Sequence, residues 1–365
     1  MIPPLTPWAQ RPRLPAEWER QAAVQLTWPH DRDGLWGDQL PAVEGCFVAM
    51  ASAIAAHQPV LVVCHDERLR ERVDVLLARA GMAAEARRLA VAPSNDIWAR
   101  DHGPITVLNG DGRPLIQDFA FNGWGQRYRA DRDDVITQHL VQQGVFGESR
   151  FRRVEWVLEG GAIDADGAGT LLTTTRCLLN DNRNPGATRA QVEQQLIARL
   201  GASRVLWLER GGLTGDDTDG HVDMLARFVD PETIVYQACD DPDDADYPEL
   251  QAMLSALRGF TTLRGGGYRL VPLPWPAIKR DEQGMRLPAS YANFLIINGA
   301  VLVPQYQDPA DDRARAVLGE LFPDREIIGI PAVPLIQQHG SVHCATMQLP
   351  AGVTVVAPDP AGHAA

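Results

Sequence analysis

The repetition of one unit of secondary structure along the whole chain is the feature that most constrains its fold. Pairs of short apolar runs flank turns and predict β-hairpins, and a hairpin, a helical segment and a further strand make up the unit. The unit recurs about five times without any repeat of residue identity, and no linker or low-complexity tract divides the chain. This recurrence predicts one closed, pseudo-symmetric assembly of the α/β class.

The predicted elements cover most of the chain. Hairpins are predicted at residues 105–121, 154–175, 221–239 and 294–306. Helices are predicted at residues 40–56, 67–80, 133–143, 189–200, 246–257 and 311–322. Further strands are predicted at residues 22–29, 59–64, 204–209, 326–332 and 341–350. In a closed assembly the strands can converge on a central channel, where residue 344 would meet residues from much earlier units.

Composition and charge argue against several kinds of partner. Hydrophobic residues make up 45% and charged residues 22% of the chain, which are ordinary values for a globular protein. The formal charge of −13 would repel a phosphate-rich partner at long range, so we expect neither a nucleic acid nor an anionic membrane as partner. The same charge would attract small cationic molecules.

The cysteines and the apolar runs indicate the cellular location of the protein. Five cysteines are scattered along the chain without a C-x-x-C pair, as expected for reduced thiols in a cytosolic protein. The first ten residues lack the basic and apolar regions of a signal peptide, and no apolar run approaches the roughly 18 residues that a membrane span needs. We therefore expect a soluble, cytoplasmic protein.

Four short stretches combine ionisable groups with glycine or tryptophan at the ends of predicted strands. They are NDIWARDHGP (95–104), LEGGAI (158–163), TDGHVDM (218–224) and SVHCATM (341–347). The first crowds Asp96, Trp98, Arg100, Asp101 and His102 into one segment that ends in Gly-Pro, a predicted turn. A carboxylate beside an indole suits a cation, but a surface ion pair of Asp96 with Arg100 over Trp98 is an equally good interpretation.

The second and third stretches supply acids and an imidazole. Glu159 precedes two glycines that permit close backbone approach, although a lone acid in such a turn is more often simply exposed. His221 and Asp223 are two residues apart, so in a strand they would point to one face and could address one small ligand. A His-x-Asp pair can also bind a metal, but a third His or Cys at ligand spacing is missing.

Cys344, in the fourth stretch, is either a buried core thiol or a catalytic nucleophile. Histidine and several acids elsewhere in the chain favour cysteine catalysis. His343 immediately precedes Cys344 and is expected to point to the opposite side of the predicted strand. We therefore pair Cys344 with His221 and not with its neighbour.

Taken together and in this order, the four stretches resemble the agmatine deiminase family of guanidine-modifying enzymes, close relatives of bacterial peptidylarginine deiminases. Further matches extend the resemblance over nearly the whole chain: LTWPHDRDGLW near the start, FNGWG (121–125), LLTTTRCLLNDNRNP (171–185) and SYANFLIINGAVLVPQYQD (290–308). The resemblance implies a single-domain, five-bladed α/β propeller of pentein type spanning residues 1–365. We expect a flexible C-terminal tail from about residue 351.

The resemblance also implies catalytic roles for five residues. The family's thiol nucleophile falls on Cys344 and its catalytic histidine on His221. The acid of its E-G-G motif falls on Glu159, where it would hold the imidazole or the substrate. Its guanidinium-binding aspartates fall on Asp101 and Asp223.

Two further positions are implied to lie near the substrate. Trp98 matches the family's substrate-side tryptophan, and Asp96 matches a motif position to which we assign a supporting role. The chain departs from the family at Gln337-Gln338-His339, where other members usually have a run of glycines before the cysteine. This departure leaves the expected chemistry intact and leaves the exact substrate open.

The implied activity is hydrolysis of agmatine to N-carbamoylputrescine and ammonia, a step of polyamine and putrescine biosynthesis, through a covalent thiouronium on Cys344. Neither a metal nor an organic cofactor is expected. The alternative within the enzyme class is a peptidylarginine deiminase that produces citrulline. A non-catalytic guanidinium- or polyamine-binding protein and a metal hydrolase are the alternatives from other classes. The expected partner is a small cationic guanidino compound, and a homo-oligomer is left open.

Overall fold

The computed structural model describes residues 12–32 and 34–358. Its strands are β1 (Gln21–Thr27), β2 (Val60–Cys64), β3 (Arg87–Val91), β4 (Ile105–Leu108), β5 (Pro114–Ala120), β6 (Arg150–Val157), β7 (Ile163–Ala165), β8 (Thr170–Thr174), β9 (Arg204–Leu208), β10 (Ala226–Asp230), β11 (Thr233–Gln237), β12 (Arg269–Leu273), β13 (Lys279–Arg280), β14 (Arg286–Leu287), β15 (Leu295–Ile297), β16 (Ala300–Gln305), β17 (Glu326–Pro331) and β18 (Thr346–Pro350). Within the described residues these strands form sheets of mixed direction.

The helices alternate with these strands. The α-helices are α1 (Leu40–Ala55), α2 (Glu67–Arg79), α3 (Ala99–His102), α4 (Gly123–Gln126), α5 (Ile136–Gln142), α6 (Thr175–Leu178), α7 (Arg189–Leu200), α8 (Tyr247–Gly259), α9 (Ala310–Leu321) and α10 (Val333–Ile336). The short 3-10 helices are η2 (Gly37–Gln39), η3 (Ala84–Ala86), η4 (Asp133–Val135), η5 (Gly160–Ala162) and η6 (Val222–Met224).

One pairing pattern recurs in five of the sheets. Their strand orders are β18-β1-β2-β3, β4-β5-β6, β7-β8-β9, β10-β11-β12 and β15-β16-β17, and β13 and β14 form a separate ribbon. In each of the five, two strands pair antiparallel and the second of them pairs parallel with a further strand. The repeating unit that the sequence predicts therefore corresponds to a repeating sheet pattern.

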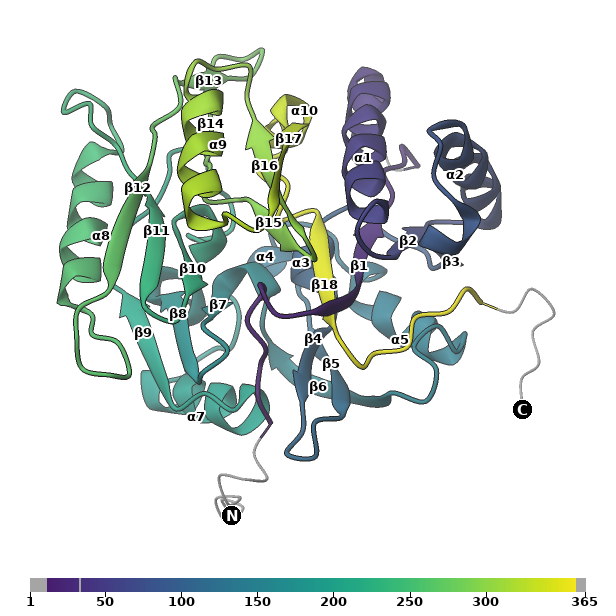
Figure 1. Cartoon of the computed structure of the whole chain (residues 1–365), viewed down its shortest axis with the longest axis horizontal. Helices are drawn as coiled ribbons and strands as arrows, with labels where there is room; N and C mark the ends of the chain where they lie inside the picture. The colour runs from purple at the N-terminus through teal and green to yellow at the C-terminus, as the bar shows by residue number, and fades with distance from the viewer. Residues whose placement is uncertain (1–11, 33, 359–365) are drawn as a thin grey trace.

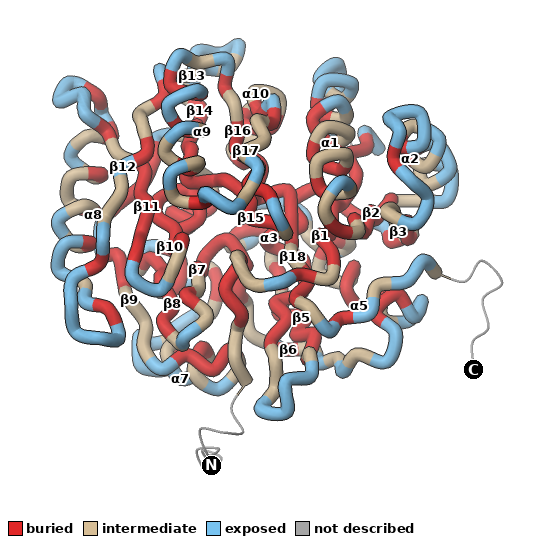
Figure 2. The backbone as a smooth tube through the Cα atoms, viewed as in Figure 1, coloured by how far each residue is buried: buried red, intermediate tan, exposed pale blue. Residues whose placement is uncertain are grey.

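The longer helices connect the parallel strands, because a parallel pair needs a crossover connection. Figure 1 shows α1, α2, α7, α8 and α9 toward the outside of the molecule, with the strands inside. Figure 2 shows that the outward faces of α2 and α8 are exposed, whereas β10, β11 and β1 are largely buried. The five residues of β2 are all buried, as expected for an apolar strand inside a mainly parallel sheet.

Local sequence signals fix several helix ends. Asp66 accepts a hydrogen bond from the backbone N–H of Leu69 and caps α2. Thr188 and Gln191 form a capping box at the start of α7, which ends at Gly201 with φ +72°. The predicted helix at residues 189–200 is therefore confirmed at both ends.

The last strand of the chain pairs with the first. β18 runs antiparallel to β1, with Leu26 opposite Thr346 and Gln21 opposite Pro350. In Figure 1 the yellow β18 lies beside the purple β1. Cys344 lies two residues before β18, so the pairing of β18 with β1 fixes its position beside elements from earlier parts of the chain.

The segments that precede β4, β7, β10, β15 and β18, each a strand of an antiparallel pair, come together. α3 precedes β4, η5 precedes β7, η6 precedes β10, a turn at 290–293 precedes β15, and a turn at 342–345 precedes β18. α3 contacts η5 and β18, and η5 contacts η6. The four sequence stretches singled out for their chemistry occupy four of these five positions.

The structure corrects two local predictions. Residues 221–224 were expected in a strand, but His221 is the N-cap of the 3-10 helix η6, after which Leu225 N–H donates to the carbonyl of Val222. Residues 341–345 are a helical turn and not a strand, because Ala345 N–H bonds to the carbonyl of Ser341 instead of to a neighbouring strand.

The region expected to be a flexible tail is described only in part. The N–H of Ala351 donates to the carbonyl of Arg20, and that of Val356 donates to the carbonyl of Val145. Residues 359–365 lie outside the described residues. Across residues 12–32 and 34–358, no helix combines the length and the apolar character that crossing a bilayer requires.

Candidate active site

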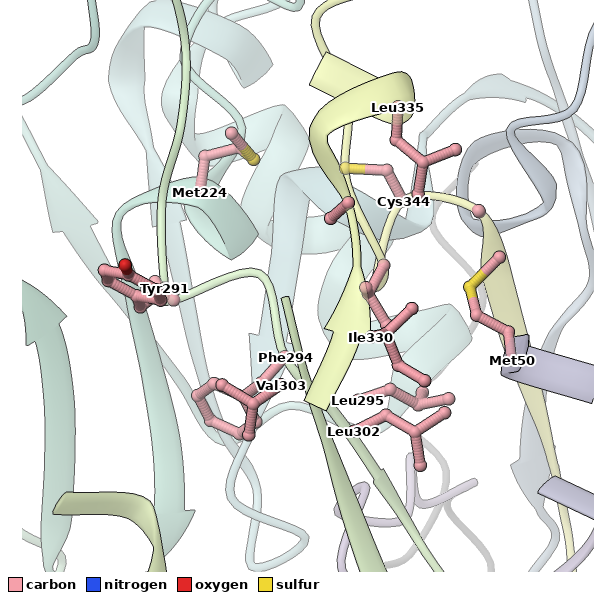
Figure 3. Close-up of a cluster of buried hydrophobic side chains, with 14 of the residues drawn as sticks. Met50, Met224, Tyr291, Phe294, Leu295, Leu302, Val303, Ile330, Leu335 and Cys344 are labelled. Carbon is pink, nitrogen blue, oxygen red and sulfur yellow. The ribbon is translucent and has the colours of Figure 1, made fainter. Parts of the chain in front are cut away.

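Cys344 lies at a pocket of about 570 Å³, a volume that includes its opening to solvent. Figure 3 shows Cys344 within the group of buried side chains that includes Leu335 and Ile330, so one side of the thiol faces the apolar core. The side chains and backbone that line this pocket are those of Leu35, Asp96, Trp98, Asp101, Trp124, Tyr128, Asp217, Thr218, Gln338, His339, Gly340 and Cys344. Three of the predicted site residues besides Cys344, namely Asp96, Trp98 and Asp101, therefore line the same pocket.

Asn293 holds the nucleophile candidate in place. Its side-chain N–H donates to Cys344 Sγ over 3.1 Å, and its side-chain oxygen accepts from the backbone N–H groups of His343 (2.9 Å) and Cys344 (3.2 Å). Asn293 is fully buried in the turn before β15. It belongs to a stretch that matches the family, but sequence reasoning assigned it no role, because an uncharged amide gives no signal on its own.

Three polar groups converge on Gly161. A methyl group built on its Cα would lie 2.6 Å from His221 Nδ1, 2.9 Å from Asp101 Oδ1 and 3.1 Å from Asp223 Oδ2. Its own N–H donates to Asp101 Oδ1 over 3.0 Å. The second glycine of the E-G-G stretch is therefore required because a side chain there would displace His221, Asp101 and Asp223.

The two aspartates are held by different partners. Asp101 Oδ2 accepts from the indole N–H of Trp124 over 2.9 Å, and its Oδ1 lies 3.6 Å from His221 Nδ1. Asp223 Oδ2 lies 2.8 Å from His343 Nδ1 and accepts from Cys344 Sγ over 3.5 Å. Asp223 Oδ1 is buried and has no hydrogen-bond partner among the described residues.

Glu159 is fully buried and paired. Its Oε1 accepts from Arg183 Nε over 2.9 Å, and Arg183 also forms an ion pair with Asp219. Glu159, His221 and Cys177 each offer an atom within 4.8 Å of the others, so this group could hold a metal ion. The cation of Arg183 beside Glu159 opposes such binding, because it already balances that carboxylate. Cys177 as a neighbour of His221 was missed by sequence reasoning.

The ionisation of the site follows from burial and crowded charge. Burial raises the pKa of Asp101 to about 6; the charge of His221 opposes this shift, and Asp223 and Glu159 add to it. Burial also raises the pKa of the Cys344 thiol well above its ordinary value, with Asp223 and Asp101 adding to the effect. Burial would lower the pKa of His221, but Asp101, Cys177 and Glu159 outweigh it and raise that pKa well above its ordinary value.

A second pair of acids lines the pocket. Burial raises the pKa of Asp96 to about 7, a shift that the backbone N–H of Ile97 opposes and the charge of Asp217 increases. Asp217 Oδ2 accepts from the hydroxyl of Tyr128 over 2.8 Å. Burial raises the pKa of Asp217 too, although the charge of His339 opposes the shift.

The stretch that departs from the family forms part of the pocket wall. Gln338 and His339 line the pocket, and His339 adopts φ +68°, a left-handed conformation that favours glycine. Gln338 Nε2 donates to the carbonyl of Leu35 over 2.7 Å. A methyl group on Gly340 would lie 2.2 Å from the Trp98 ring, so this glycine allows the indole to lie against the chain.

Two expectations about side-chain pairs are wrong. Asp96 and Arg100 do not form a surface ion pair, because Arg100 is buried and turns toward Glu17 and Gln348. His343 does not point away from Cys344 across a strand, since both contact Asp223 Oδ2 from one turn. No hydrogen bond joins Cys344 to His221 among the described residues; both instead approach the aspartates.

Solved structures share this architecture. A structure from Porphyromonas gingivalis, provisionally assigned as an arginine deiminase, is 50% identical and covers 94% of this chain and 100% of its own, with a TM-score of 0.88. A Cys→Ser variant of the C. jejuni agmatine deiminase with substrate bound is 31% identical, with a TM-score of 0.87, and covers 96% of this chain and 99% of its own. The protein therefore has the mixed α/β fold of these deiminases.

Sequence comparisons define the family. The sequence model of the Porphyromonas-type peptidyl-arginine deiminases matches residues 13–350. An agmatine deiminase of Ectopseudomonas mendocina is 35% identical over 95% of this chain and 97% of its own length. The chain belongs to the Porphyromonas-type peptidyl-arginine deiminase family, with the agmatine deiminases among its relatives, as the resemblance of the sequence motifs predicted.

Asn293→Asp tests the support of the thiol. The variant keeps an acceptor for the backbone of His343 and Cys344 but replaces the donor to Sγ with a carboxylate oxygen, so we expect thiolate formation to become harder. A loss of roughly ten- to a hundred-fold in kcat/KM is expected, with slower alkylation of Cys344 by iodoacetamide at equal pH. Unchanged alkylation and turnover in a folded variant would contradict this role.

Proposed function

We propose that the protein is an agmatine deiminase, which hydrolyses agmatine to N-carbamoylputrescine and ammonia. The observation that carries the proposal is a pocket lined by the Cys344 thiol and the Asp101 carboxylate, for a guanidinium, and by a second pair of acids, Asp96 and Asp217, for an amine. Neither arginine nor lysine is among the described residues that line it. A ligand with a cation at each end fits such a pocket better than one with an anionic end.

The guanidinium would lie between Asp101 and Asp223. It stays charged at any biological pH and presents five N–H donors in a fixed plane, so carboxylates on two sides can orient it. The partnerless Asp223 Oδ1 is one acceptor that such a ligand would satisfy. The central carbon of the guanidinium would then face the thiol of Cys344.

The reaction would proceed in two halves. The Cys344 thiolate attacks the guanidinium carbon and forms a C–S bond, which gives a tetrahedral adduct. His221 donates its proton to the departing nitrogen, the C–N bond breaks, and ammonia leaves a thiouronium on the cysteine. His221 then takes a proton from water, whose oxygen attacks the same carbon, and the C–S bond breaks to release the ureido product. The raised pKa of His221 supports its role as the initial proton donor.

Substrate binding would itself activate the thiol. In the free enzyme, burial and the charges of Asp223 and Asp101 hold the pKa of Cys344 well above its ordinary value. A bound guanidinium offsets both negative charges beside the sulfur, and this favours the thiolate when it is needed. Glu159, fixed by Arg183, would favour the charged form of His221.

The primary amine of agmatine would lie beside Asp96 and Asp217. Burial raises the pKa of both carboxyls, and their mutual repulsion adds to the shift of Asp96. A cation between them removes that repulsion, so binding the amine relieves a charge conflict already present in the pocket. Trp98 would cover the connecting methylene groups, since it lines the same pocket.

A peptidylarginine deiminase is the second candidate. The matched family model and a structure that is 40% identical, provisionally assigned as a peptidyl-arginine deiminase, favour it. Free arginine is disfavoured, because its carboxylate would meet Asp96 and Asp217 without a basic partner in the described pocket wall. Arg100, the nearest basic residue in the motif, is engaged by Gln348 and Glu17.

The proposal extends to the arrangement of the five sheets. We infer that the five sheets surround one axis as blades of an α/β propeller, all within one domain. Support comes from the site, to which the segments before β4, β7, β10, β15 and β18 each contribute one or more residues. If the five units are arranged around one axis, the segments before these strands all lie near that axis, where they can form one site.

Metal dependence separates a thiol enzyme from the metal hydrolase considered above. We expect full agmatine turnover after exhaustive dialysis against EDTA and no gain from added Zn²⁺ or Ca²⁺, because the proposed nucleophile and proton donor are side chains. Loss of activity with EDTA and its return with one particular metal would support the group formed by Glu159, Cys177 and His221 instead.

Cys344→Ala tests covalent catalysis. The side chain removed is small, so we expect a folded protein in which agmatine turnover falls on the order of a thousand-fold or more. Mass spectrometry of the unmodified protein, quenched with acid during agmatine turnover, should show an adduct on Cys344 that is absent from Cys344→Ala. If the unmodified protein shows no turnover and agmatine still binds to Cys344→Ala, the result would favour a non-catalytic binding protein.

Substrate choice is tested with agmatine, arginine, a blocked arginyl peptide and butylguanidine, which has the same guanidinium but no amine. Agmatine should have the highest kcat/KM. Asp217→Asn should lower kcat/KM roughly ten-fold for agmatine and little for butylguanidine, because only agmatine loses an ion pair. Preference for the arginyl peptide would support a peptidylarginine deiminase. If Asp217→Asn lowers kcat/KM equally for agmatine and butylguanidine, Asp217 does not bind the amine.

A further inference from the structure

His343 lies between two buried carboxylates. Its Nδ1 is 2.8 Å from Asp223 Oδ2, and its Nε2 is 2.7 Å from Glu17 Oε2. The side chains of all three residues are at most 6% exposed. Ionised carboxylates only accept hydrogen bonds, so both contacts are satisfied together only when both ring nitrogens of His343 carry a proton.

The charges around His343 agree with an imidazolium. Glu17 Oε2 also lies 3.0 Å from Arg227 Nη2 and 3.6 Å from Arg100 Nη2, and Arg227 Nε donates to Asp164 over 2.8 Å. The connected group holds three carboxylates, Glu17, Asp164 and Asp223, and three basic residues, Arg100, Arg227 and His343. The group is balanced in charge only if His343 is protonated, which favours that form in a buried setting.

We propose that His343 is a positioning residue that keeps Asp223 ionised and turns its free oxygen toward the guanidinium of the substrate. One oxygen of Asp223, Oδ2, is occupied by His343 and by the Cys344 thiol. The other, Oδ1, is buried without a partner among the described residues and is the oxygen available to a ligand. The inference deepens the proposed deiminase function and rests on it for the identity of the ligand.

This role differs from that of a base for the thiol. Both ring nitrogens of His343 are engaged by carboxylates, and Sγ contacts Asp223 and Asn293. His343 therefore acts on the reaction through Asp223, and Glu17 acts through His343. Glu17 lies 326 positions before His343 in the chain, in the segment that precedes β1.

A change in pH dependence follows from the groups that face Asp223. These groups are His343 and Cys344 from the turn before β18, His221 from its own segment, Arg100 and Asp101 from α3, and Arg227 from β10. Burial would raise the pKa of Asp223, but the hydrogen bond and charge of His343, followed by the charges of His221 and Arg227, outweigh it and lower the pKa. Without the charge of His343, Asp223 takes up a proton at higher pH and loses its attraction for the guanidinium there.

The main experiment uses two substitutions of His343. Asparagine places an N–H near the position of Nδ1 and can still donate to Asp223, whereas alanine cannot, and neither carries a charge. We expect the acid limb of kcat/KM for agmatine to move to higher pH in both variants, by about one unit, which corresponds to about ten-fold at pH values below the limb. The loss should appear mainly in KM, and asparagine should retain more activity than alanine.

Matched controls separate this role from a general effect on folding. Glu17→Gln should move the acid limb in the same direction, because it removes the charge that favours the imidazolium. His57→Asn, which changes a histidine beside Glu326, should leave the profile unchanged. A drop in kcat without any shift of the acid limb or of KM in the His343 variants would overturn the proposal.

A measurement without turnover keeps the test independent of the substrate. In protein labelled with ¹⁵N at histidine, the two ring nitrogens of His343 should both give N–H signals, assigned by their absence in a His343→Asn protein whose other histidine signals are unchanged. A ring with only one N–H would overturn the inference. Failure of the wild-type protein to act on agmatine, with His343 still doubly protonated, would count against the proposed function and not against the charge state of His343.

Discussion

Repulsion among buried carboxylates is the constraint on which the rest of this site depends. Asp101, Asp223 and Glu159 lie around the fully buried His221, and without partners their charges would be too costly to bury together. Each has a different solution: Trp124 and Gly161 donate to Asp101, His343 lies against Asp223, and Arg183 pairs with Glu159. The negative charge that these partners leave uncompensated makes the potential in the pocket negative, and a bound cation would offset it.

The fold supplies this arrangement because it repeats. Each of five sheets contains an antiparallel strand pair, and the turn or short helix before one strand of that pair carries one or more site residues: Asp101, Glu159, His221, Asn293 and Cys344. No single unit contains the site. A short segment held at the end of a buried strand is a rigid support, which explains why charged groups can be kept close without a ligand.

Much of the fold could be predicted from the sequence, because strands and helices follow from local periodicity and from caps such as Thr188 and Gly201. Asp101, His221 and Cys344 could be proposed as site residues from the sequence because their side chains are chemically conspicuous. Asn293 and Glu17 were not found, since their roles exist only through contacts with a turn that is distant from each of them in the sequence. The strand expected at His343 fails for the same reason: that turn is held by Asn293, far away in the sequence.

The late position of Cys344 has a physical consequence for how the site is completed. The thiol is placed by the pairing of β18 with β1 and by Asn293, and its neighbour His343 is held by Glu17 just before β1. The pairing of β18 with β1 and the contact of His343 with Glu17 join residues from opposite ends of the chain, so they close a long loop at an entropic cost that the packing of the closed molecule must offset. The same contacts place His343 beside Asp223. The pairing that places the proposed nucleophile therefore also places the group that offsets the charge of the carboxylate beside it, and both depend on the first and last strands meeting.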